Sequence, residues 1–138
     1  MKYLLKSIKA TLATAIPSMA NRVFMSVVPS TIKLADGPYI RVVFVGQDDT
    51  QYAFSDQVGY DQTVLQFSVF AESLTGADTI VDSILVAFQG VALTLDVGVP
   101  ARGLKNKRGI IVEPKSPNAN QTFHSWVTIN FFHEDKLS

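Results

Sequence analysis

One segment, residues 64–90, switches within a few residues from the period of a strand to the period of a helix. Apolar residues first alternate with polar ones, as they do in a half-buried strand: Leu65, Phe67, Val69 and Ala71. Apolar residues then recur at helical spacing: Ala77, Ile80, Val81, Ile84, Leu85 and Phe88. The pattern predicts a strand that runs directly into a helix, and therefore a layered α+β domain.

The two ends of this helix carry their own signals. Thr75 and Asp78 have the spacing of a capping box, which predicts the start of the helix. Gly90 stands where a left-handed residue commonly ends a helix.

The first 16 residues predict a second amphipathic helix. Its apolar face comprises Leu4, Leu5, Ile8, Leu12, Ala15 and Ile16. The basic start and the sequence Ser18-Met19-Ala20 also suit a cleaved signal peptide, but Lys6 and Lys9 interrupt the apolar run that such a peptide needs. We therefore expect a retained helix that ends before Pro17, because proline removes a backbone donor.

Further strands are predicted at 39–45, 91–97, 110–113 and 122–133 from their β-branched and aromatic residues. We expect the strands near 39–45, 64–71 and 122–133 to share one mostly antiparallel sheet, with both helices packed on one of its faces. The predicted core contains Phe67, Ile84, Leu85, Phe88, Ile129 and Phe131. The last strand has aromatic residues on both faces, so self-association is expected to cover the second face.

Composition limits the classes of function. The 138 residues fit one domain spanning 1–138, with 12 basic and 12 acidic residues and no cysteine. A net charge of zero argues against a protein built chiefly to bind nucleic acid. Only 17% of residues are charged, which suggests that other chains cover part of the surface. No apolar run reaches the length of a membrane span, so no membrane association is expected.

Chemical motifs are equally sparse, and we predict no enzymatic activity, metal site or cofactor. The serines lack a nucleophile elbow, and no histidine has an evident acidic partner. His124 and His133 are nine residues apart in one predicted strand, so they point to opposite faces and cannot share a metal. Asp48, Asp49 and Asp56 could suggest an ion site, but a polar loop explains them better.

Two segments are candidates for interaction. The segment 46–61 is either a long hairpin arm or an unstructured excursion, and it carries too many apolar residues for a solvated loop: Tyr52, Phe54, Val58 and Tyr60. We expect it to order against a partner. The segment 100–108 is predicted to be a basic turn with four cations: Arg102, Lys105, Lys107 and Arg108. This turn is either a solvated hairpin or a contact for nucleic acid or for an acidic partner ring.

The order of elements resembles a known family along nearly the whole chain. An amphipathic helix precedes N-R-V-F at 21–24, and G-P-Y-I-R-V-V-F follows at 37–44. The strand V-L-Q-F-S-V-F-A at 64–71 runs into a helix that ends F-Q-G, and S-W-V-T-I-N-F-F at 125–132 closes the pattern. These features resemble the tail-completion family of long-tailed bacteriophages, whose members join tails to heads or terminate tails.

The resemblance implies a structural virion protein that forms a ring, expected to be a hexamer, at the head–tail junction. Such a ring would cap the tail tube, with the tail tube protein on one side and the head connector on the other. It would let DNA pass without sequence-specific binding, and it would assemble in the host cytoplasm before residing in the virion. The alternative is a nucleic-acid or ligand-binding module that uses the basic turn 102–108.

Overall fold

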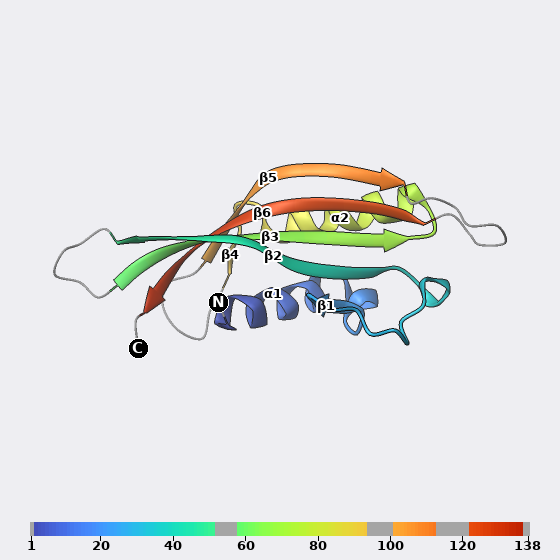
Figure 1. The fold of residues 1–138 in the computed structure, drawn as a ribbon, viewed down its shortest axis with the longest axis horizontal. Coiled ribbons are helices and arrows are strands. Elements are labelled where there is room, and N and C mark those ends of the chain that lie inside the picture. The colour runs from blue at the N-terminus through green and yellow to red at the C-terminus, as the bar shows by residue number, and fades with distance from the viewer. Residues whose placement is uncertain (1, 52–57, 94–100, 113–121, 137–138) are drawn as a thin grey trace.

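The computed structural model describes residues 2–51, 58–93, 101–112 and 122–136. Within these ranges, two α-helices, two short 3-10 helices and six strands follow one another (Figure 1). They are α1 (Lys2–Ala15), η1 (Pro17–Met19), β1 (Val23–Met25), η2 (Leu34–Asp36), β2 (Tyr39–Gln51), β3 (Val58–Ala71), α2 (Leu74–Phe88), β4 (Ala92–Leu93), β5 (Ala101–Val112) and β6 (Phe123–Lys136).

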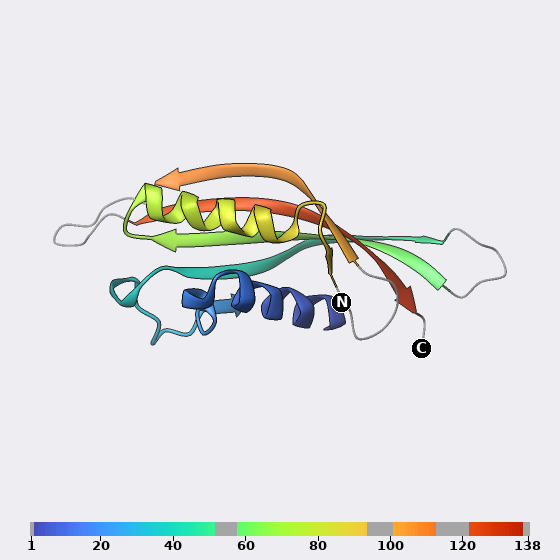
Figure 2. The ribbon, with the colours of Figure 1, turned by 180° about the vertical axis from the view of Figure 1, so that it is seen from behind.

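The six strands form one sheet in the order β1-β2-β3-β6-β5-β4. Only β1 and β2 are parallel, and every other neighbouring pair is antiparallel. Both helices lie on the same face of the sheet, behind it in Figure 1 and in front of it in Figure 2. The predicted α+β architecture, with a mostly antiparallel sheet and two helices on one face, is therefore confirmed.

The core lies between the sheet and the helices and centres on three phenylalanine rings. Phe67 of β3, Phe88 of α2 and Phe131 of β6 are fully buried, with ring centroids 5.3–6.2 Å apart. Of the six predicted core residues, five are fully buried, and Leu85 is only partly buried. Helix α1 contributes Leu4, Ile8 and Leu12 to the same core, as its apolar stripe predicts.

The predicted N-terminus of α2 is wrong by a few residues. Ser73, not Thr75, is the N-cap residue, and its hydroxyl accepts a hydrogen bond from the backbone N–H of Gly76 at 3.0 Å. Ser73 has extended backbone angles, which a cap requires, whereas Thr75 already lies within the helix. Gly90 has a φ of +71°, so the left-handed residue after the helix is confirmed.

We expect Ser73→Ala to lower the free energy of unfolding by about 1 kcal/mol, because the mutation leaves a helix-terminal N–H without its side-chain acceptor. Thr75→Ala is the matched control and should change stability by less than about 0.5 kcal/mol. Urea denaturation of the two variants measures both values. Equal losses in the two variants would contradict the assignment of Ser73 as the cap.

Two strand predictions need correction. The segment 100–108 is not a turn, because residues 101–108 belong to β5, and those from 102 onward pair with residues 127–132 of β6. The predicted strand 110–113 is the end of this same strand, with residue 113 outside the described residues. Of the predicted strand 91–97, β4 covers two residues, and residues 94–100 lie outside the described part of the chain.

The segment 46–61 is a hairpin arm where the structure describes it. Strands β2 and β3 remain paired as far as Gln51 and Gly59, and β6 pairs with β3 as far as Lys136. We call the outer part of these three strands, residues 46–51, 58–64 and 130–136, the arm. The arm extends past both helices, to the left in Figure 1.

Candidate interaction surfaces

The face of the sheet opposite the helices is covered by no other element of the described chain (Figure 1). We call it the open face. Four rings form a row across it, because the strand register places Tyr39 beside Phe70 and Phe70 beside His124. Their centroids are 6.4 Å apart for Phe24 and Tyr39, 5.0 Å for Tyr39 and Phe70, and 4.3 Å for Phe70 and His124.

The indole of Trp126 lies beside this row, over the backbone of β5. Trp126 pairs with Gly109, and a Cβ atom added to Gly109 would stand only 2.5 Å from Cζ2 of the indole. A glycine is therefore needed at position 109, because any side chain there would occupy the space of the ring.

Aliphatic and aromatic side chains on the open face are partly exposed. Leu104, Ile111 and Phe132 have exposed fractions of 52%, 46% and 42%. The register places Leu104 beside Asn130 and Ile111 beside His124, so both share the face of Trp126. A contiguous surface of this kind is suited to bind another apolar surface rather than to perform acid–base chemistry.

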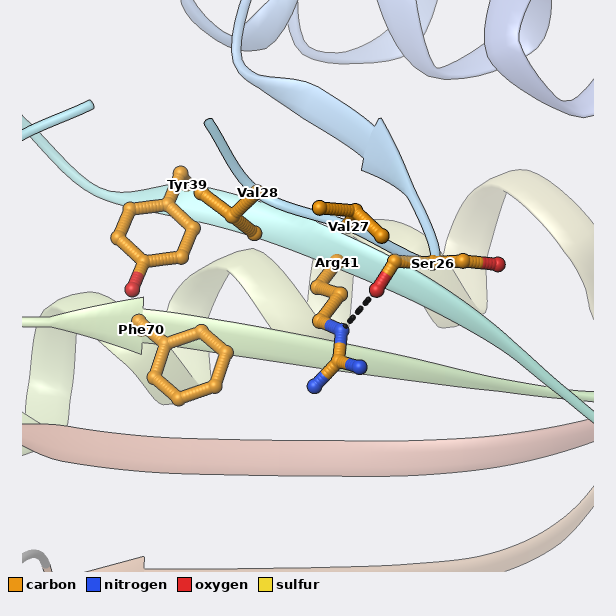
Figure 3. A pocket seen from close by; sticks show the side chains of 6 residues that line it. All are labelled: Ser26, Val27, Val28, Tyr39, Arg41 and Phe70. Carbon is orange, nitrogen blue, oxygen red and sulfur yellow. Dashed lines mark hydrogen bonds between the residues drawn. The ribbon is translucent and has the colours of Figure 1, made fainter. Parts of the chain in front are cut away.

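A shallow groove of about 340 Å³ lies at the β1 end of the open face (Figure 3). Tyr39, Arg41 and Phe70 line one side, and residues 26–28 line the other. Arg41 Nε donates a hydrogen bond to the carbonyl oxygen of Ser26 at 2.6 Å, and Ser26 has a left-handed φ of 68°. The hydrogen bond ties the segment after β1 to β2, and thereby joins the two sides of the groove.

The four predicted basic residues do not form one cluster. Arg108 lies toward the helices, where its guanidinium pairs with Asp78 and, at 2.7 Å, with Asp82 of α2. The hydrogen bond to Asp78 raises the pKa of Arg108, against the lowering effect of partial burial, and Asp82 raises it further. Arg108 therefore stays charged and links β5 to α2.

The other three cations are exposed and divide between the two faces of β5. Arg102 and Lys107 pair with Phe132 and Thr128 on the open face, whereas Lys105 pairs with Ile129 on the helix side. A bulge at Asn106 separates Lys105 from Lys107. The sequence showed the charges but not this division, because the face of each residue depends on the strand register and on the bulge.

Four residues of the segment 46–61 are predicted to bind a partner: Tyr52, Phe54, Val58 and Tyr60. Tyr52 and Phe54 lie outside the described residues. Val58 and Tyr60 lie in β3, where Tyr60 pairs with Thr50 on one side and with Glu134 on the other. The roles of all four residues in binding stay predictions.

Within the described ranges, no group of three or more His, Asp or Glu side chains is placed to hold a metal ion. None of the helices found there is long and apolar enough to cross a membrane.

Comparisons with known proteins support the fold. No model of a protein family matches the chain, and no curated protein matches it either. Among solved structures, a chain of the virion of a native gene transfer agent particle has the same fold, with a TM-score of 0.60 and 15% sequence identity. The match covers 97% of this chain and 93% of the virion chain, so the helices, the sheet and their order are shared along almost the full length of both.

Proposed function

We propose that this chain is a structural virion protein that forms a ring at the head–tail junction, caps the tail tube and joins it to the head connector. The observation that carries the proposal is the match in fold, over nearly the whole length, to a chain of a virion particle. The resemblance of the element order to tail-completion proteins supports the position at the head–tail junction that we propose. Both lines point to an assembly protein rather than to an enzyme.

The open face supports assembly as the mode of action. Its aromatic row and its partly exposed apolar residues would lose contact with water when a second protein covers them. A ring is the arrangement in which one surface of each subunit meets a different surface of the next, with every copy making both contacts.

The alternative, a nucleic-acid-binding module built on residues 102–108, loses support from the geometry. A phosphate-binding surface needs several cations on one side, and this strand divides its cations between two faces and pairs Arg108 with two carboxylates. Residues 102–108 therefore do not present the convergent basic surface that a turn would offer.

Size-exclusion chromatography with light scattering, followed by negative-stain imaging, tests the proposal. We expect discrete rings, either of the purified chain alone or after mixing with tail tube protein, and we expect the rings to sit at the tube ends. A monomer that ignores tubes and binds DNA in a salt-sensitive manner would instead favour the alternative.

The arm is expected to be needed for assembly but not for folding. Replacing residues 50–60 by Asn-Gly closes a two-residue hairpin between Asp49 and Asp61, which are already paired. The variant should keep its thermal midpoint within a few degrees, because the buried residues lie outside the arm apart from two that the variant retains, Thr63 and Phe131. We expect it to form no rings and complete no tails, and normal virion yield with this variant would refute the role of the arm.

A further inference from the structure

The outer edge of β5 is open along most of its length. Strand β4 pairs only with Ala101 and Arg102, and the carbonyl oxygen of Gly103 accepts the N–H of Gly90 at 2.9 Å. From Leu104 to Val112, no strand of the described chain lies on the outer side of β5. An open edge of this length is a template for pairing with another strand.

This edge carries apolar residues on both of its sides. Ile111 and Leu104 are partly exposed on the open face, and Ile110 has an exposed fraction of 50% on the helix side. Lysines often prevent unwanted pairing of edge strands, and Lys105 and Lys107 are exposed here. A strand that carries negative charge would be attracted by these two lysines rather than repelled.

The arm supplies such a charge. Its three strands contain five acidic residues and a single lysine, Lys136. The register brings the acidic positions together across the strands, since Asp49 pairs with Asp61, and Glu134 and Asp135 pair with the two residues before Asp61. The chain is neutral as a whole, but five of its 12 acidic residues lie in the arm, whereas Lys105 and Lys107 are exposed on β5.

The arm and the lysines of one chain cannot meet each other. Lys105 and Lys107 pair with Ile129 and Thr128 of β6, whereas Asp61 pairs with His133. Asp48 is closer along the strands, since it pairs with Gln62, which pairs with Phe132, but its strand β2 is separated from β5 by β3 and β6. The two sites are therefore at least three residues apart along β6, about 10 Å at the rise of an antiparallel strand. The attraction between them can be satisfied only between copies.

We propose that the subunits of the ring associate head to tail, with the acidic arm of one copy lying along the outer edge of β5 of the next. This proposal rests on the ring of the proposed function and names its subunit interface. The strand facing β5 would be β2 of the next copy, because the outer edge of β2 from Val43 to Gln51 is also open within the described chain. Asp48 and Asp49 lie in this stretch.

Strand direction agrees with this pairing. Within one sheet, β2 and β5 run in opposite directions, because the neighbouring pairs β2–β3, β3–β6 and β6–β5 are all antiparallel. Copies related by rotation about an axis inclined to the strands keep these directions, and the inclination supplies the shift along the strands that brings the arm of one copy level with the lysines of the next. Strand β2 of one copy would then meet β5 of the next as an antiparallel pair, with backbone hydrogen bonds between subunits.

Charge reversal on each side of the interface provides the test. The first variant carries Lys105→Glu and Lys107→Glu, and the second carries Asp48→Lys and Asp49→Lys. Each variant alone should need at least about tenfold more protein than the native chain to form rings, because like charges then face each other. A 1:1 mixture should form rings again, with the two variants alternating, since each reversed surface then meets a reversed partner.

The control variant carries Lys9→Glu and Lys33→Glu, which change the net charge of the chain as the first variant does but lie on α1 and in the loop before η2. It should form rings as the native chain does. Circular dichroism and the recovery in the mixture together show that the reversed variants are folded.

Two results would overturn the interface while the ring stands: rings formed by either reversed variant as readily as by the native chain, or a mixture that fails to recover. A native chain that stays monomeric at every concentration, with and without tube protein, would overturn the ring itself and this interface with it.

Discussion

Phe131→Ala is expected to lower the free energy of unfolding by about 3–5 kcal/mol, the range for truncating a fully buried phenylalanine. The ring of Phe131 packs against Phe67 at 6.2 Å and against Phe88 at 5.5 Å, so its removal leaves a cavity between the sheet and α2. Neighbouring side chains can fill little of this space, because β3 and β6 are held in register along their whole length. Urea denaturation followed by circular dichroism measures the loss.

Phe132→Ala is the matched control, because it removes the same side chain from the next residue of the same strand. Phe132 is on the open face with an exposed fraction of 42%, whereas Phe131 is fully buried. We expect a loss of less than about 1.5 kcal/mol for Phe132→Ala, since the solvated site leaves no closed cavity. Similar losses at the two positions would mean that the open face is covered within the subunit, contrary to the fold described above.

The unit formed by β3 and α2 could be predicted because the spacing of its apolar residues matches the residues that the fold buries. The alternation that ends at Ala71 buries all four expected side chains, and the helical spacing that begins at Ala77 buries four of six, with Ile80 and Leu85 partly buried. The cap was harder to predict, since Ser73 and Thr75 are both good capping residues. The choice depends on where the extended backbone of β3 ends, which the side chains near the boundary do not specify.

Strand β5 could not be recognised from its composition. Glycine and asparagine are poor strand formers and good turn formers, and lysine is also depleted in strands, so the segment 100–108 has the local pattern of a loop. It becomes a strand through pairing with β6 and through the ion pairs of Arg108 with α2. Its glycines also have structural roles, since a Cβ atom at Gly103 would come within 3.0 Å of Phe131 and of the carbonyl oxygen of Phe88. These contacts are between residues distant in sequence.

The residue types of the interaction surfaces could be predicted from the sequence, but their positions on the sheet could not. Apolar residues on both sides of the last strand indicated a second covered face, and the open face has the aromatic residues that this prediction requires. The charges of the arm and of β5 are visible in the sequence, but the distance along the sheet between the acidic residues and the lysines is not. It follows from the register between β3, β6 and β5, which is set by the packing of the sheet against the helices.

Gly109→Ala is expected to displace the indole of Trp126. The new Cβ atom would lie 2.5–2.8 Å from three atoms of the ring, closer than van der Waals contact allows. Backbone adjustment is limited, because Gly109 and Trp126 are directly opposite each other in paired strands. We expect a loss of about 1–3 kcal/mol in unfolding free energy, the usual cost of overpacking. The emission of Trp126, the single tryptophan of the chain, should shift to the red as the ring enters solvent.

Two control experiments test whether the loss of stability comes from the contact between the new Cβ atom and the indole of Trp126. Gly46→Ala introduces the same methyl group into β2 with no atom within 4 Å of it, and should change stability by less than about 0.5 kcal/mol. In a Trp126→Ala background, Gly109→Ala should likewise cost less than about 0.5 kcal/mol, because the clash is gone and the two mutations are coupled. An equal cost of Gly109→Ala in both backgrounds would place the strain in the backbone of β5. If the coupling is found, the absence of a side chain at Gly109 is what allows the indole of Trp126 to pack against β5 on the open face.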